Sequence, residues 1–123
     1  RNKKVIPILL TPVSRRSFDS AGQLKETHLV YSGLVRDLAR ELAVPLIDHD
    51  NLSRKLLQQF GPENSKLLFL QLLPGEHPNY PDGKIDNTHF NELGARKMAE
   101  LVLAEIRSLN LELAERIVKP VLK

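Results

Sequence analysis

The chain has 123 residues, 41% hydrophobic and 27% charged, a composition that predicts one small folded domain rather than a disordered segment. It contains no cysteine, which excludes a disulfide framework and a thiolate zinc site and leaves the compartment undecided. The net charge is only +3, no basic stripe is interleaved with aromatic residues, and no apolar run reaches membrane-spanning length. Neither nucleic acid nor a membrane is therefore expected as a partner.

The first predicted element is a strand over residues 3–10, because the run VIPILL is typical of a strand buried on both faces. Pro7 has no N–H and argues against a fully bonded central position. A long polar loop over residues 11–29 follows. Loops of this length in compact domains are commonly functional or poorly ordered, and both alternatives stay open for this loop.

A helix is predicted over residues 30–42, with charged residues facing water (Arg36, Asp37, Arg40, Glu41) and an apolar stripe facing the core (Val30, Leu34, Leu38, Leu42). Pro45 disfavours helical geometry at the residue before it and so ends this helix. A short strand over residues 44–48 comes next. Strand, helix and strand of these lengths predict a βαβ unit.

In the second half, Asp50 or Asn51 is predicted to cap a helix that Gly61 ends, and residues 67–73 to form a short apolar helix. Residues 74–89 are rich in turn formers and are predicted to be irregular. Asn91 is predicted to cap a last helix to about residue 109, with these residues buried: Met98, Leu101, Val102, Ile106. The tail over residues 111–123 is expected to extend as an amphipathic helix until Pro120.

These elements define an α/β chain with two parallel strands flanked by helices. A lone two-stranded sheet is marginal, and both strands have the composition of central strands, so further strands are needed to complete the sheet. The neighbouring strands are expected from a preceding half of the polypeptide, from another copy of the chain, or from a strand misread here.

The strongest candidates for catalytic residues are Asp86 and His89, three positions apart just before the last helix. An Asp at this spacing can fold back so that its carboxylate meets the imidazole Nδ1–H, which leaves Nε2 free as a general base. The alternative is that Asp86 and Thr88 make ordinary turn or cap hydrogen bonds, with His89 a plain loop residue. The spacing alone is weak support for the catalytic interpretation.

Three other segments, taken with Asp86-x-x-His89, carry a family resemblance: residues 11–16 (TPVSRR) after the first strand, residues 78–84 (PNYPDGK) and residues 94–96 (GAR). Over roughly residues 5–111 the chain resembles the C-terminal half of a GDSL/SGNH hydrolase. It is most similar to the rhamnogalacturonan acetylesterase group of carbohydrate esterases. The resemblance implies the C-terminal part of a flavodoxin-like, three-layer hydrolase fold, forming residues 1–123 as one segment of a single domain.

In that family, Asp86 and His89 correspond to the acid and base of a Ser-His-Asp triad. The blocks that supply the family's Gly-Asp-Ser nucleophile and its oxyanion hole are absent, and the chain opens at Arg1 without Met. We therefore expect half an enzyme, inactive alone, and completed by the N-terminal half of the same hydrolase or by another copy. A signal region would precede the chain, so secretion or a periplasmic location stays open.

The expected substrate is an acetylated polysaccharide of the pectin type, and no cofactor is expected. Arg15 and Arg16 are candidates for binding a uronate carboxylate, with a structural ion pair or loop anchor as the alternative. His77 is a candidate for contact with substrate and Tyr80 for stacking on a sugar ring. His28, like His77, lies in a polar loop, and both are otherwise interpreted as solvated.

Two further patterns receive structural interpretations. Ser20 follows Asp19 in a loose likeness to Gly-Asp-Ser, but the preceding Gly is missing and an ordinary turn is favoured. The run from Asp48 to Asp50 is not favoured as a metal site, because alternation separates neighbouring side chains and no further ligand set follows. The alternative function is a non-catalytic α/β module that binds carbohydrate or protein.

Overall fold

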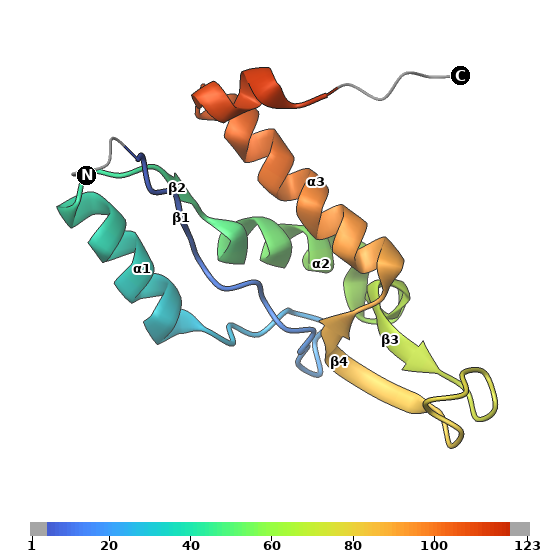
Figure 1. Ribbon diagram of the computed structural model, residues 1–123. Coiled ribbons are helices and arrows are strands. Elements are labelled where there is room, and N and C mark those ends of the chain that lie inside the picture. Colours follow the sequence, from blue (N-terminus) through green and yellow to red (C-terminus); the bar gives the residue numbers. More distant parts are fainter. Residues whose placement is uncertain (1–4, 119–123) are drawn as a thin grey trace.

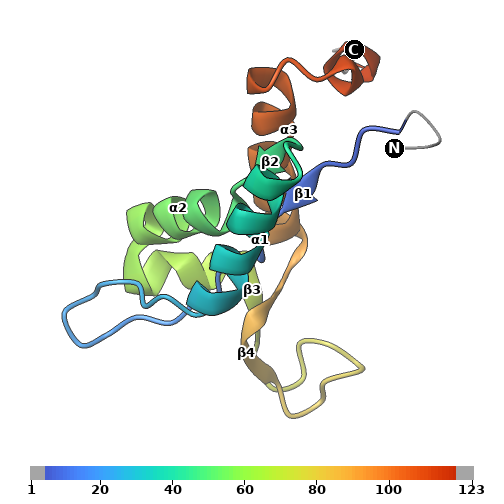
Figure 2. The same ribbon diagram turned by 90° about the vertical axis from the view of Figure 1, so that its left-hand side faces the viewer.

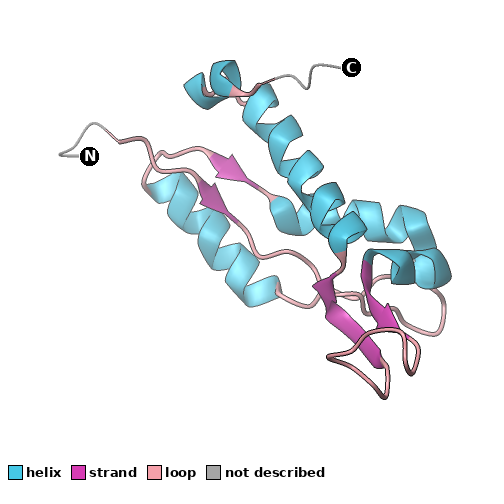
Figure 3. Cartoon of the chain, turned by 45° about the vertical axis from the view of Figure 1, so that its right-hand side comes forward, coloured by secondary structure: helices cyan, strands magenta, loops and turns pink. Residues whose placement is uncertain are grey.

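The computed structural model describes residues 5–118 and has an α/β architecture with a small parallel sheet (Figure 1). The elements in chain order are β1 (Leu9–Leu10), α1 (Leu29–Glu41), β2 (Leu46–Ile47), α2 (His49–Asn64), the 3₁₀ helix η1 (Ser65–Leu68), β3 (Phe69–Leu72), β4 (Lys84–Phe90), α3 (Glu92–Ser108) and the 3₁₀ helix η2 (Glu112–Arg116). The two-stranded sheet of β1 and β2 lies between α1 and α3 (Figures 1 and 3). No helix of residues 5–118 is both long and apolar enough to cross a membrane.

The predicted βαβ unit is present. Strands β1 and β2 run parallel with Leu9 opposite Leu46 and Leu10 opposite Ile47, and α1 connects them. The first strand is shorter than the predicted residues 3–10, because only Leu9 and Leu10 have a described strand beside them. Residues 3 and 4 lie outside the described part of the chain. The loop that follows β1 and leads to α1 projects from the body of the molecule (Figure 2).

An antiparallel hairpin replaces most of the helix predicted over residues 67–73 and the last part, residues 84–89, of the segment predicted to be irregular, whereas residues 74–83 are a loop with turns as predicted. Phe69 lies opposite Phe90 and Leu72 opposite Lys84, with an irregularity in register between Phe69 and Gln71. The prediction was wrong because a short apolar run has no periodicity that separates a helix from a strand. A strand was thus misread, but it does not supply the missing neighbours of the parallel sheet, because β3 and β4 form a sheet of their own and do not extend that of β1 and β2 (Figure 3).

Helix α2 begins at a different cap from the predicted one. Asp48 is the N-cap and its side chain accepts a hydrogen bond from the Asn51 backbone, whereas Asp50 is buried and pairs with Arg36. The predicted break at residues 61 and 62 is present as a kink inside α2. Gly61 adopts a φ of 72°, a conformation that only glycine takes without strain.

The main core lies where α2, η1 and the hairpin meet. Leu57, Leu68 and Phe69 are fully buried there, and Phe90 packs against Phe69 with ring centroids 4.7 Å apart. Helix α3 is present as predicted, capped by Asn91, with Met98 buried and the other three predicted core residues half-buried. After it, the predicted helical extension is only the short η2, and residues 119–123 lie outside the described part.

Helix α1 differs from the prediction in the face that it buries, although Asp37, Arg40 and Glu41 are exposed as predicted. Its apolar stripe is exposed, with Val30 at 69% and Leu34 at 62%, while Ser32 and Ala39 are buried. Arg36, predicted to face water, is instead turned toward Asp48 and Asp50. The reason is that the described chain has no element packed on the stripe, whereas the two carboxylates need a cation.

Candidate active site

The turn at the end of β4 joins Asp86 to His89 through both oxygens of one carboxylate. Oδ2 lies 2.8 Å from Nδ1 of His89. Oδ1 accepts hydrogen bonds from the Thr88 backbone N–H and hydroxyl, both at 2.7 Å, and from the His89 N–H at 3.0 Å. The turn contacts offered as the alternative and the Asp–His contact therefore coexist, and each uses a different oxygen.

These contacts fix the charge of the acid and the tautomer of the base. The Thr88 hydroxyl, followed by the backbone N–H groups of Thr88 and His89 and the His89 ring, holds the pKa of Asp86 far below its ordinary 3.8. An ionised carboxylate only accepts hydrogen bonds, so Nδ1 of His89 carries the hydrogen and Nε2 keeps its lone pair. The Asp86 side chain is 13% exposed and that of His89 is 78% exposed, which shields the acid and leaves the base open.

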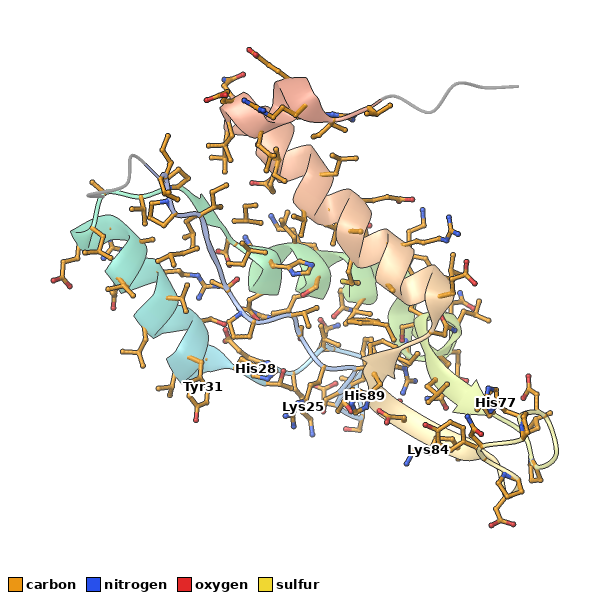
Figure 4. The ribbon with its side chains drawn as sticks, viewed as in Figure 1. Lys25, His28, Tyr31, His77, Lys84 and His89 are labelled. Atoms are coloured by element: carbon orange, nitrogen blue, oxygen red, sulfur yellow. The ribbon has the colours of Figure 1, made fainter. Side chains whose placement is uncertain are left out.

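The His89 ring lines an open depression of about 440 Å³. Three segments form it: the loop after β1, the start of α1 and the end of β4 (Figure 4). The lining residues are Pro12, Val13, Ser14, Arg15, His28, Thr88 and His89. The depression therefore brings the loop carrying Arg15 beside the base, from 74 positions earlier in the chain.

Arg16 anchors this loop to the turn that contains Asp86 and His89. Its backbone N–H donates to the Asn87 carbonyl at 3.0 Å and its guanidinium donates to Asn87 Oδ1 at 2.9 Å. The other two guanidinium nitrogens, Nε and Nη2, donate to Ser65 Oγ and to the Pro62 carbonyl. With its donors used in this way, Arg16 fits the loop-anchor alternative better than binding of a substrate carboxylate.

Gln71 on β3 supports the same turn. Its side-chain amide donates to the Asp86 carbonyl at 2.7 Å and to Asn87 Oδ1 at 3.3 Å. The turn is thus held from two sides, by a strand neighbour and by an arginine distant in sequence. The sequence offered no signal for this role, because a glutamine in a strand and an arginine in a loop are both common on surfaces.

The other candidate substrate-binding residues lie in two separate parts of the structure. Arg15 lines the depression, and its guanidinium makes no hydrogen bond or ion pair within residues 5–118. His77 and Tyr80 lie in the loop between β3 and β4 with their rings 5.6 Å apart, away from His89 (Figure 4). Substrate binding by these three residues stays a prediction.

His28 is the residue that sequence reasoning passed over. It was interpreted as a solvated loop histidine, yet it lines the depression together with His89. No sequence signal could have placed it there, because 60 residues separate the two rings and only the fold joins them.

Two carboxylates that follow β2, at the start of α2, form an ion-pair network with Arg36 of α1. Arg36 donates to Asp48 at 2.8 and 3.0 Å and to the fully buried Asp50 at 2.9 Å, and the Thr11 hydroxyl donates to Asp48. Burial alone raises the pKa of Asp48, but the hydrogen bonds from Arg36, Asn51 and Thr11 outweigh it and the pKa is lowered. Between residues 5 and 118, no group of three or more His, Asp or Glu side chains is arranged to hold a metal ion.

Comparison with known proteins supports the resemblance seen in the motifs. No family model matches the chain. It is 45% identical over 118 residues to rhamnogalacturonan acetylesterase RhgT of Bacillus subtilis (strain 168), a match that covers 96% of this chain and 51% of RhgT. It is 33% identical over 119 residues to probable rhamnogalacturonan acetylesterase YesY of the same strain, covering 97% of this chain and 50% of YesY.

Among solved structures, the crystal structure of protein YxiM from Bacillus subtilis matches with a TM-score of 0.64 at 28% identity. That match covers 85% of this chain and 26% of YxiM. The chain spans about half the length of the curated relatives it matches. These matches confirm the predicted resemblance to rhamnogalacturonan acetylesterases.

Proposed function

Because the chain resembles rhamnogalacturonan acetylesterases over nearly all of its length, we propose that it is the acid- and base-bearing portion of a serine esterase. The whole enzyme removes acetyl groups from rhamnogalacturonan, a pectin-type polysaccharide. The observation that carries this proposal is the contact of 2.8 Å between Asp86 Oδ2 and His89 Nδ1, with the ring open to a depression.

The reaction follows from the free lone pair on His89. A serine hydroxyl supplied from outside this chain attacks the acetyl carbonyl carbon, and Nε2 takes the hydroxyl proton. Asp86 stabilises the imidazolium that forms. The bond between the acetyl carbon and the sugar oxygen then breaks, and Nε2 returns the proton to that oxygen. Water repeats the sequence on the acetyl-serine and releases acetate and the free serine.

The serine is proposed to come from elsewhere because the described serines do not fit the task. Ser14 lines the depression, but it is buried and its hydroxyl donates to the Arg15 carbonyl at 3.3 Å. Ser20 lies in an exposed turn where Asp19 accepts the Ala21 N–H at 2.9 Å, and it is not among the lining residues. The isolated chain is therefore expected to lack turnover.

Completion by another segment also accounts for the exposed apolar stripe of α1. We propose that the N-terminal half of the same hydrolase, or another copy of the chain, packs there and adds strands to the sheet of β1 and β2. Arg15 is proposed to bind a uronate carboxylate through its two-point guanidinium geometry. His77 and Tyr80 are proposed to meet a more distant sugar of a long polymer.

The decisive experiment joins this chain to the half of RhgT that it does not match. We expect the chimera to release acetate from acetylated rhamnogalacturonan. Asp86→Asn is expected to lower turnover by about 10⁴, the loss seen when the orienting acid of such a triad is replaced. His89→Ala is expected to lose at least as much. The matched control is Arg40→Gln, which removes only an exposed ion pair with Asp37 and is expected to retain activity.

A chimera that is folded by circular dichroism but inactive, or a His89→Ala variant that retains activity, contradicts the proposal. Sugar binding that is indifferent to His89→Ala, without any turnover, instead supports the non-catalytic module. Inactivity of the isolated chain is tested with p-nitrophenyl acetate beside Ser14→Ala. Turnover that disappears in Ser14→Ala would show that the chain carries its own nucleophile.

A further inference from the structure

A second histidine shares the depression with His89 and has no part in the reaction described above. His28 occupies the N-cap position of α1, where Ser, Thr, Asp or Asn side chains stabilise a helix by accepting a backbone N–H. The His28 side chain makes no such capping hydrogen bond. Helix stability therefore does not explain why a histidine stands at this position.

The neighbours of His28 favour one of its two tautomers. The Arg15 backbone N–H donates to the Thr27 hydroxyl oxygen at 3.2 Å, and that oxygen lies 3.0 Å from Nδ1 of His28. The Thr27 hydroxyl proton finds its acceptor when Nδ1 of His28 keeps its lone pair, and the ring hydrogen is then on Nε2. In this tautomer His28 offers an Nε2–H donor, whereas His89 offers a lone pair.

The depression as a whole is rich in donors. No carboxylate is among its lining residues, the Arg15 guanidinium is without a partner within residues 5–118, and the Thr88 hydroxyl already donates to Asp86. A site of this kind attracts an oxygen-rich ligand whose atoms accept hydrogen bonds.

We infer that His28 is a substrate-recognition residue whose Nε2–H, together with the Arg15 guanidinium, binds an acceptor oxygen of the sugar beside the acetyl group. The inference rests on the proposed function, since it takes the ligand of this depression to be a sugar. The acceptor oxygen belongs either to a carboxylate or to hydroxyl groups, and the experiment separates the two.

The experiment follows the four histidine ring signals of the 123-residue chain in ¹H–¹³C NMR spectra. One titration uses sodium galacturonate and a second uses galactose, its neutral counterpart. We expect the rings of His28 and His89 to shift with the ligand while the ring of His49 stays unchanged. Shifts with galacturonate alone identify a carboxylate as the acceptor, and equal shifts with both sugars identify hydroxyl oxygens.

Two variants separate recognition from a structural role. His28→Ser removes the donor and introduces a good capping residue, so we expect binding about tenfold weaker, as for loss of a hydrogen bond to a charged group, with a higher urea midpoint. His28→Gln keeps an amide donor near the place of Nε2 and is expected to recover binding. The surface variant Arg40→Gln serves as the control.

Unshifted His28 signals with both sugars, or His28→Ser binding as tightly as the unmodified chain, overturn the inference. A lower urea midpoint for His28→Ser also overturns it, because that result assigns His28 to helix stability. The titration needs no serine nucleophile. Failure of the RhgT chimera with successful titration therefore refutes the esterase alone, and the reverse result refutes only the role of His28.

Discussion

Gly94 is the position where a single methyl group should disturb the segment that follows His89. It lies in the first turn of α3, and its N–H donates to the side chain of the capping residue Asn91 at 3.0 Å. A Cβ atom placed on Gly94 would lie 1.9 Å from the Leu68 carbonyl oxygen and 2.8 Å from Phe90 Cδ1. Ordinary van der Waals contacts begin at 3.4 Å, so Gly94→Ala requires α3 to move away from η1.

The size of the effect follows from what the methyl group meets. Overpacking a close-packed site costs about 1–3 kcal/mol, and a backbone carbonyl cannot rotate aside as a flexible side chain does. Helix propensity favours alanine over glycine by about 1 kcal/mol and offsets only part of this loss. Taking the upper end of that range and subtracting the gain in helix propensity, we expect Gly94→Ala to lower the free energy of unfolding by about 2 kcal/mol.

Gly33 in α1 provides the matched control, because a Cβ there meets no atom within 4 Å. Gly33→Ala is expected to raise the free energy of unfolding by about 0.5–1 kcal/mol. Both variants are measured by urea unfolding followed by far-UV circular dichroism. Opposite signs support the reasoning, and a Gly94→Ala variant as stable as the unmodified chain refutes it.

Three further predictions concern charge. Arg36→Met leaves the buried Asp50 without its cation and is expected to lower the free energy of unfolding by about 3 kcal/mol, measured in urea; no loss would contradict the pairing. Thr88→Val removes the first cause of the low pKa of Asp86, so a ¹³C carboxyl titration should show that pKa rising toward 3.8. Burial lowers the pKa of His49 below 6.5, so the unfolded chain binds the proton more readily, and stability that is full above about pH 6.5 should decline as the pH falls below it. His49→Leu should flatten this decline in urea midpoints, and an unchanged slope would contradict it.

Elements with strong local signals could be predicted from the sequence. Helix α3 has a capping asparagine, a regular apolar face and 17 residues, so its start and end were both close to the observed ones. The βαβ unit was equally predictable from the sequence, because Pro45 separates α1 from β2. The hairpin was not, because β3 is four residues long and β4 carries the polar run KIDNTHF, which lacks strand alternation. β3 and β4 form strands because they pair with each other, and no local sequence pattern predicts that pairing.

The candidate site was likewise predictable only in part from the sequence. The contact between Asp86 and His89 was foreseeable, because three residues and their own backbone N–H groups suffice to form it. The anchoring of that turn by Arg16 was offered only as one of two alternatives, since the choice depends on Asn87, which lies 71 positions away. The exposure of α1 could not be foreseen either, because amphipathicity states which face is apolar and not whether another element covers it.

The local construction of the acid–base pair has a consequence for how a complete site would assemble. Because Asp86, Thr88 and His89 hold one another through contacts of 2.7–3.0 Å within four residues, the base keeps its tautomer whether or not other segments are present. The supporting arginine also comes from this chain. Under the proposed function, the serine nucleophile and the oxyanion hole are then the parts whose placement relative to Nε2 depends on docking, and proton transfer requires the serine hydroxyl within about 3 Å of Nε2.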